Sequence, residues 1–202
     1  QGIFGGVPVG GMEGGAGFNY QAVIDQPYMF DFYEGGGLDI ASLSFAQVDR
    51  VGNVNVHRFD DRLRGPGGFP NISAHTPRIC YVGTFTTGGL RVAIEDGRLQ
   101  IIEEGMFFNK QKKAYEISFS GRMATERGQQ VKYITERAVF DLIDGVVTLT
   151  EMAEGIDAEK DVLAHMGFEP AVADDLTTLD PRVFADGPMD SRSELGPLIR
   201  ST

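Results

Sequence analysis

The sequence predicts an α/β domain with added β-hairpins. Three observations support this fold class: short apolar runs rich in β-branched residues recur along the chain, glycine clusters follow many of them, and one well-capped helix is indicated late in the sequence. Glycine makes up 27 of the 202 residues, about 13% against a usual value near 7%. Strands that end in glycine loops are typical of α/β sheets, in which ligands bind outside the carboxyl ends of the strands.

The strands are predicted from their patterns of apolar residues. Residues 38–43 and 79–83 indicate short buried strands, because both are apolar and bounded by turn residues. Residues 51–56 alternate as half-buried β structure does. Two hairpins are predicted at 91–102 and 139–149, where an Asp-Gly pair joins two apolar runs.

The helical signals are fewer. Residues 19–24 indicate a short helix, and residues 157–166 indicate a longer one that is capped by Asp157 and stopped by a glycine. We expect one α/β domain over 1–170. Residues 171–202 are polar and proline-containing with little periodicity, which predicts an extended C-terminal tail or packing arm.

Composition excludes several classes of protein. Eighteen basic and 29 acidic residues give a net charge of −11, which repels nucleic acid and anionic lipid. No apolar run is long enough to cross a membrane. Cys80 is the single cysteine, so we expect no internal disulfide, a buried core thiol and a cytoplasmic location. Gln1 stands where a complete chain would have methionine, so we expect a piece of a longer protein.

Common catalytic motifs are absent. His57, His75 and His165 have no paired spacing and no neighbouring cysteine, so no metal site is predicted. Neither a G-x-S-x-G elbow nor a G-x-x-x-x-G-K-[ST] phosphate loop is present. Residues 10–15 superficially match a dinucleotide loop but lack the strand and helix that should flank it.

Six short motifs nevertheless follow one another in a familiar order. They are 2–8 (GIFGGVP), 30–39 (FDFYEGGGLD), 47–56 (QVDRVGNVNV), 65–69 (GPGGF), 83–86 (GTFT) and 135–140 (TERAVF). The ordered set, spanning residues 1 to about 185, resembles the C-terminal, glutamate-bearing half of the family I CoA-transferases, closest to enzymes that exchange CoA among short-chain acids. The resemblance implies a three-layer open sheet of the NagB/RpiA-like type, mostly parallel, with added hairpins.

The resemblance also implies a nucleophile. The family pattern is E-x-G-x-x-G, and Gly2 and Gly5 match its two glycines, so the catalytic glutamate is expected immediately before Gln1. Neither Glu13 nor Glu34 fits the pattern. An ionised carboxylate needs no general base to attack a thioester. The implied course runs through a mixed anhydride to a glutamyl-CoA thioester, with CoA as substrate and no permanently bound cofactor.

Further site residues are carried over from the family. Gly67 and Gly68 are expected to offer backbone donors to the tetrahedral oxyanion, for which one donor is typically worth roughly 3–4 kcal/mol. The alternative for the glycines is that they only form tight turns with positive φ. The residues expected to contact CoA are Ser44, Thr86, Gly35, Gly36 and Gly37.

The charged residues divide into two groups. Arg62 and Arg64 precede the glycine loop and are candidates for contact with CoA phosphates, whereas the lysines at 110, 112 and 113 are expected to form a solvated face. Glu136 and Arg137 are expected to make structural contacts.

Two functions from different classes follow. The first is the C-terminal part of a CoA-transferase acting on small carboxylic acids, active only with the N-terminal half and inactive by itself, and expected to form a homo-oligomer. The second is a CoA-binding or subunit-interaction module without a nucleophile.

Overall fold

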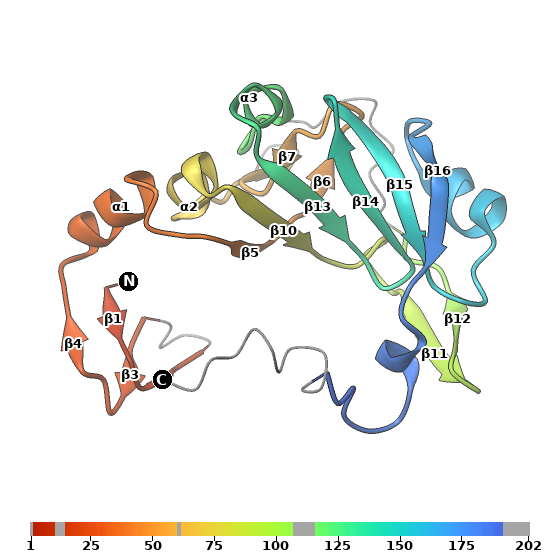
Figure 1. Cartoon of the computed structure of the whole chain (residues 1–202), viewed down its shortest axis with the longest axis horizontal. Helices are drawn as coiled ribbons and strands as arrows, with labels where there is room; N and C mark the ends of the chain where they lie inside the picture. The colour runs from red at the N-terminus through yellow and green to blue at the C-terminus, as the bar shows by residue number, and fades with distance from the viewer. Residues whose placement is uncertain (1, 11–14, 60–61, 107–115, 192–202) are drawn as a thin grey trace.

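A six-stranded sheet forms the centre of the molecule (Figure 1). The computed structural model describes residues 2–10, 15–59, 62–106 and 116–191. The strands, in spatial order, are β16 (Ala171–Thr178), β15 (Val146–Met152), β14 (Ala138–Ile143), β13 (Gln130–Ile134), β10 (Arg78–Val82) and β5 (Ala41–Ser44). Only β14 runs antiparallel to its neighbours in this sheet. The mostly parallel α/β sheet with flanking helices is confirmed.

Both predicted hairpins are present. One joins β11 (Arg91–Glu95) to β12 (Arg98–Glu103), and the other joins β14 to β15. In each turn the Asp and the Gly both have positive φ, 52° and 73° in the first and 50° and 78° in the second. This is the backbone that a two-residue Asp-Gly hairpin requires.

Residues 171–178 belong to the sheet and not to a tail. They form β16, which pairs in parallel with β15 from Thr148↔Ala171 to Met152↔Thr178. The predicted boundary at residue 171 is therefore wrong. The strand was missed because an edge strand faces solvent along much of its length, so its sequence carries no clean apolar alternation. Of the remaining stretch, 181–184 form a 3₁₀ turn, and 192–202 lie outside the described residues.

The N-terminal segment is an extended two-stranded arm. Strand β1 (Ile3–Phe4) pairs with β4 (Ala22–Val23), and β2 (Val7–Pro8) pairs with β3 (Gly17–Phe18). In Figure 1 the arm lies below α1 and apart from the sheet. The short helix predicted at 19–24 is wrong, because pairing with β1 holds this stretch extended.

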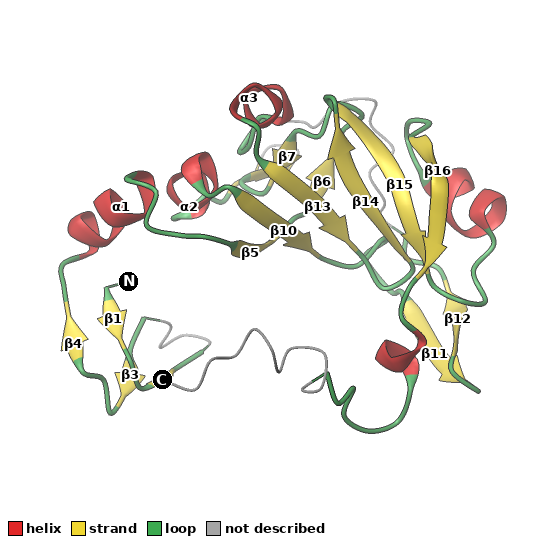
Figure 2. Ribbon diagram, viewed as in Figure 1, coloured by secondary structure: helices red, strands yellow, loops and turns green. Residues whose placement is uncertain are grey.

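Three helices that the sequence pattern did not reveal flank the sheet (Figure 2). They are α1 (Gln26–Glu34), α2 (Phe69–His75) and α3 (Gly121–Arg127). All three have nine residues or fewer, too short for a clear helical period. The ends of α3 are set by Ser120, whose side chain accepts from the Met123 N–H, and by left-handed Gly128.

The predicted helix at 157–166 is real but irregular. Asp157 caps it as expected, since its side chain accepts from the Lys160 N–H at 2.8 Å. A π-helical turn over Ala158–Val162 passes directly into a 3₁₀ turn over Leu163–His165. Val162 is fully buried in the core, so the segment is anchored to the sheet by that side chain.

The small strand pairs between β5 and β10 complete the fold. Strand β6 (Gln47–Val48) pairs with β7 (Val54–Asn55), and β8 (Arg58–Phe59) pairs with β9 (Arg62–Leu63). The half-buried strand predicted at 51–56 is thus only two residues long. Over the described part of the chain, no helix is both long and apolar enough to cross a membrane.

A stack of aromatic rings lies at the centre of the core. The Tyr81 ring on β10 lies parallel to the rings of Phe69 and Tyr133, with centroids 5.6 Å away in each case, and Phe119 meets it edge-on at 5.3 Å. Since Phe69 is the first residue of α2, this stack attaches the helix to the sheet. Cys80 points away from the core and is partly exposed, so the prediction of a buried thiol is wrong.

Candidate functional site

The carboxyl ends of three adjacent parallel strands meet at one edge of the sheet. Val82 of β10 lies opposite Ser44 of β5 on one side and opposite Ile134 of β13 on the other. The Gly83 N–H extends this ladder by donating to the Ile134 carbonyl at 3.1 Å. In α/β sheets this edge is where ligands bind, and several predicted site residues lie here.

The loop 65–68 is held over the carboxyl half of β10. It leads directly into Phe69, whose ring stacks on Tyr81, the fourth residue of that strand. Gly67 has a φ of +56° and is exposed, with open space where a Cβ would lie. Among the described residues, no acceptor is bonded to the Gly67 or Gly68 N–H. Two free amides therefore remain in this loop for an incoming anion.

Gly68 is also required for helix packing. A Cβ at this position would lie 2.9 Å from the Phe30 ring of α1. Close by, Asn71 of α2 donates a hydrogen bond to the Glu34 carboxylate at the end of α1. The loop is thus fixed on one side by the aromatic stack and on the other by α1.

Ser44 is exposed at the end of β5. The next residue, Phe45, packs against Gly83, where a Cβ would meet the Phe45 ring at 3.1 Å. The end of β5 and the start of the loop 83–86 are therefore in contact, and the Ser44 hydroxyl is free to reach a ligand at this edge.

Thr86 is placed differently from the expectation. Its side chain is only 1% exposed, and its hydroxyl donates to the Glu104 carboxylate and accepts from the Gly105 N–H at 3.0 Å. Direct contact between this hydroxyl and CoA would require both bonds to break. In this structure, Thr86 attaches the loop 83–86 to Glu104 and Gly105.

An ion cluster around the buried Arg137 side chain contacts that loop. The Arg137 side chain is fully buried, and its guanidinium donates to Glu104 at 2.8 and 3.1 Å and to Glu136 at 2.7 Å. It also donates to the Asp161 carbonyl at 2.9 Å and lies 4.8 Å from the centre of the Phe85 ring. The expectation that Glu136 and Arg137 make structural contacts is confirmed.

These contacts change the acidity of Glu104. Burial alone would raise its pKa. The hydrogen bonds from Arg137 and Thr86 and the positive charge of Arg137 outweigh this effect and lower the pKa to about 2. Burial lowers the pKa of Arg137, and its bonds to Glu104 and Glu136 more than reverse this. Glu104 and Arg137 are therefore both ionised at neutral pH.

A run of three glycines terminates α1, and all three of its amides are bonded to carbonyls of that helix. The N–H groups of Gly35, Gly36 and Gly37 donate to three carbonyls of the helix, those of Asp31, Tyr33 and Phe32, at 2.8, 3.2 and 2.9 Å respectively. Gly36 adopts a φ of +85°, and a Cβ at Gly37 would lie within 2.4 Å of the Phe32 ring.

Gly35, Gly36 and Gly37 therefore end a helix, and their expected contact with CoA stays a prediction. Each amide is already bonded within α1 or its cap, and the left-handed backbone at Gly36 is one that glycine adopts without strain. This is the turn-forming alternative that the sequence left open.

Gly2 and Gly5 lie in the arm. Gly2 has a φ of +80° and is so close to the opposite strand that a Cβ would lie 2.0 Å from the Ile24 carbonyl oxygen. Gly5 has a φ of +69°. Both positions need glycine for the backbone conformation.

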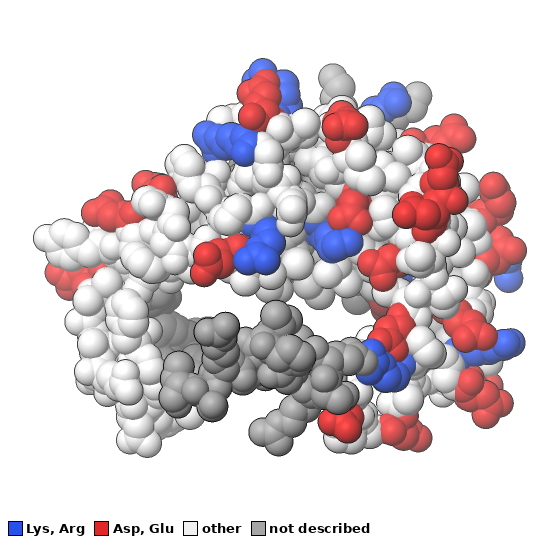
Figure 3. All heavy atoms as spheres, in the orientation of Figure 1, with Lys and Arg blue, Asp and Glu red and all other residues white. Residues whose placement is uncertain are grey.

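The basic residues near the site are few. Arg62 and Arg64 are exposed in the stretch that leads to the glycine loop, so they remain candidates for phosphate contact. Acidic side chains gather over β15, β16 and the helical segment 158–165 (Figure 3), a side that disfavours CoA phosphates. The lysines at 110, 112 and 113, and Glu13, lie outside the described residues.

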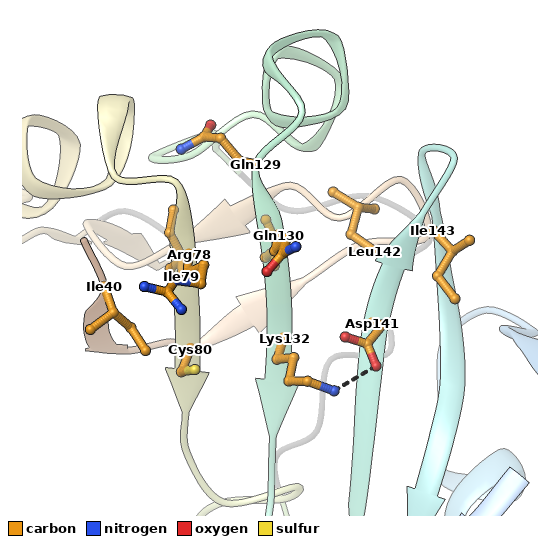
Figure 4. A pocket seen from close by; sticks show the side chains of 11 residues that line it. Ile40, Arg78, Ile79, Cys80, Gln129, Gln130, Lys132, Asp141, Leu142 and Ile143 are labelled. Atoms are coloured by element: carbon orange, nitrogen blue, oxygen red, sulfur yellow. Dashed lines mark hydrogen bonds and ion pairs between the residues drawn. The ribbon is translucent and has the colours of Figure 1, made fainter. Parts of the chain in front are cut away.

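A hollow over strands β10, β13 and β14 contains none of the predicted site residues. Figure 4 shows the side chains of β10, β13 and β14 that line it, with the Lys132–Asp141 ion pair at 2.8 Å. Cys80 and Arg78 also face it. Its lining is shared between apolar and paired polar groups, so it offers no evident chemistry.

Comparison with known proteins identifies the family. No family model matches the chain. The chain is 46% identical over 188 residues to "Acetate CoA-transferase YdiF" of Escherichia coli (strain K12) and 44% identical over 190 residues to "Caffeate CoA-transferase" of Acetobacterium woodii, covering 93% and 92% of this chain. The structure of the acyl-CoA transferase YdiF from E. coli O157:H7, as a thioester complex with CoA, matches 93% of it with a TM-score of 0.86 and 45% identity. The chain belongs to the family I CoA-transferases.

The chain spans about a third of the length of its relatives, 35% of YdiF and 36% of the Acetobacterium woodii enzyme. Sequence reasoning placed Ser44, Gly67 and Gly68 at the strand-end edge but missed Glu104. That residue follows a predicted hairpin in an acidic, loop-like context, and no local signal links it to Arg137, 33 positions away.

Proposed function

We propose that this chain is the C-terminal part of a CoA-transferase that moves CoA between a short-chain acyl-CoA and a free carboxylic acid. The observation that carries the proposal is the similarity at 45% identity to a CoA-transferase whose structure is a thioester complex with CoA. The chemistry runs through a glutamyl-CoA thioester, with the nucleophilic glutamate expected directly before Gln1. The proposed location is the cytoplasm.

The site residues have distinct roles in this proposal. The free amides of Gly67 and Gly68 stabilise the tetrahedral oxyanion that forms in each acyl-transfer step. Ser44 donates a hydrogen bond to CoA from the end of β5, and Arg62 and Arg64 attract its phosphates. Gly2 and Gly5 shape the turn that follows the nucleophile.

The rest of the enzyme supplies what this chain does not contain. Its relatives are nearly three times as long, so the N-terminal half is the first proposed partner and contributes part of the acid-binding pocket. A homo-oligomer of the complete protein is part of the same proposal. By itself, the chain is expected to be inactive.

Borohydride trapping tests the mechanism. The complete protein is incubated with acyl-CoA and then reduced, which should convert the glutamyl thioester to an alcohol that mass spectrometry locates on the glutamate before Gln1. The matched variant carries alanine at that glutamate and should show neither the modification nor transfer. Normal transfer by this variant would disprove the proposal, and CoA binding without any transfer by the wild type would favour the binding-module alternative.

A further inference from the structure

The loop 83–86 is held by two carboxylates that a single arginine links. The Phe85 N–H donates to Glu136 at 2.9 Å, and the Thr86 hydroxyl donates to Glu104. Arg137 bonds to both carboxylates at once. Consecutive residues of the loop are thus fixed, one through its backbone and one through its side chain.

The cluster joins segments that are distant in sequence. Glu104 follows β12, Glu136 and Arg137 form the turn between β13 and β14, and Asp161 belongs to the helical segment 158–162. That turn is tight by itself, because the Thr135 hydroxyl donates to the Ala138 carbonyl at 2.7 Å and accepts from the Ala138 N–H at 3.0 Å. The turn that carries Glu136 is therefore rigid independently of the loop 83–86.

Stability alone does not explain such a cluster. Replacing a buried ion pair by well-packed apolar residues is often neutral or stabilising, because desolvation offsets most of the Coulombic attraction. Charge-assisted bonds instead select one geometry, since both partners must be in place for either charge to be satisfied. Here the charge-assisted bonds fix the position of the loop 83–86, which lies beside Ser44.

We propose that Glu136, held by Arg137, is a positioning residue that fixes the backbone of the loop 83–86 for the binding of the CoA part of the substrate. This inference rests on the proposed function and assigns a role to a residue that touches neither the reacting carbonyl nor CoA. Loss of the Phe85 anchor should weaken acyl-CoA binding and leave the chemical step nearly unchanged.

The test uses the complete protein with Glu136→Ala, Glu136→Gln and Asp141→Asn. The alanine variant removes the acceptor for Phe85, whereas glutamine keeps an oxygen acceptor at the same place. Asp141→Asn is the control, because it weakens the Lys132–Asp141 pair on the same sheet away from the loop. The readouts are kcat, KM for acyl-CoA, and hydrogen exchange of the peptide covering 83–88.

For Glu136→Ala we expect KM to rise about five- to tenfold, the loss of roughly one hydrogen bond, with kcat within about twofold. Exchange of the peptide 83–88 should quicken. Glu136→Gln should recover most of the affinity, and Asp141→Asn should match the wild type in all three measurements.

Two results would overturn the inference. One is a folded, active Glu136→Ala enzyme with unchanged KM and unchanged exchange. The other needs no variant. It is exchange of 83–88 in the wild type as fast as that of the loop 65–68, whose amides donate to no acceptor among the described residues, and it decides the matter even if the alanine protein does not fold. A wild-type protein that transfers no CoA refutes the proposed function itself, which distinguishes that failure from failure of the anchor.

Discussion

The guanidinium of Arg137 donates two hydrogen bonds to the carboxylate of Glu104, at 2.8 and 3.1 Å. The Arg137 side chain is fully buried, and that of Glu104 is 25% exposed. This pair connects the end of a peripheral hairpin to the carboxyl edge of the central sheet. Its strength should therefore be measurable both as stability and as a dependence of stability on pH.

Glu104→Gln should destabilise the protein in a pH-dependent way. The folded-state pKa of Glu104 is about 2 against an ordinary value of 4.5, so its ionised form contributes stability above pH 4.5 that is lost as pH falls toward 2. We expect the variant to lose about 2 kcal/mol of unfolding free energy at pH 7 and much less near pH 2.5. Urea unfolding at both pH values measures the difference.

A surface pair provides the control for that experiment. Glu126→Gln removes the Arg122–Glu126 contact on α3, whose side chains are 77% and 60% exposed. It should change stability by less than about 0.5 kcal/mol at either pH. Equal losses in the two variants would show that burial of the Arg137 cluster has no special effect.

Gly121→Ala should be strongly destabilising. A Cβ at Gly121 would lie 2.0 Å from the Val51 carbonyl oxygen and 2.8 Å from the Gly52 carbonyl carbon, and backbone atoms cannot move aside cheaply. We expect a loss of about 2–3 kcal/mol, measured by thermal or urea unfolding. Gly10→Ala is the matched variant, since no described residue lies within 4 Å of the Cβ it would add. Wild-type stability for both variants would contradict the close approach of α3 to this turn.

Two stacked tyrosines should respond differently to loss of the hydroxyl. Tyr133 donates to the Gly52 carbonyl at 2.7 Å, so Tyr133→Phe should cost about 1–2 kcal/mol. The buried Tyr81 hydroxyl has no hydrogen-bond partner in the described part of the chain, and burial raises its pKa more than nearby Ser73 lowers it. Tyr81→Phe should therefore be neutral or slightly stabilising. Chemical unfolding of both variants measures the two changes in unfolding free energy. Equal losses in Tyr133→Phe and Tyr81→Phe would contradict this prediction.

Ser44→Ala should weaken acyl-CoA binding by the complete enzyme. Loss of one hydrogen bond predicts a rise in KM of about three- to tenfold with little change in kcat. Ser42→Ala is the control, because Ser42 is also exposed on β5 but lies opposite Cys80, two residues before the strand end. If both variants bind acyl-CoA like the wild type, Ser44 has no part in the site.

Local sequence signals were sufficient where neighbouring residues determine the structure. The Asp-Gly pairs at 96–97 and 144–145 form hairpins because both residues of each pair accept positive φ. Asp157 caps its helix by accepting a hydrogen bond from the Lys160 N–H, only three residues further along the chain. The ordered motifs indicated the family, which the similarity to YdiF confirms.

The same signals failed where another segment decides the conformation. Residues 19–24 are extended only because β1 lies beside them, and 171–178 form a strand only because the edge of β15 is available. The amides of Gly35, Gly36 and Gly37 complete the end of α1, a helix that the sequence pattern did not reveal. In each case the partner segment outweighs a weak local preference.

The sequence by itself determined the α/β class, the two hairpins and the membership of a CoA-transferase family. Tertiary structure alone decided which residues meet at the sheet edge. Within the described residues it gave the amides of Gly67 and Gly68 no acceptor, buried Thr86, and brought Glu104 to Arg137. The physical reason is the distance along the sequence over which each interaction acts. Turn and cap chemistry acts over a few residues, whereas a buried charge is satisfied by whichever partner the folded chain places beside it.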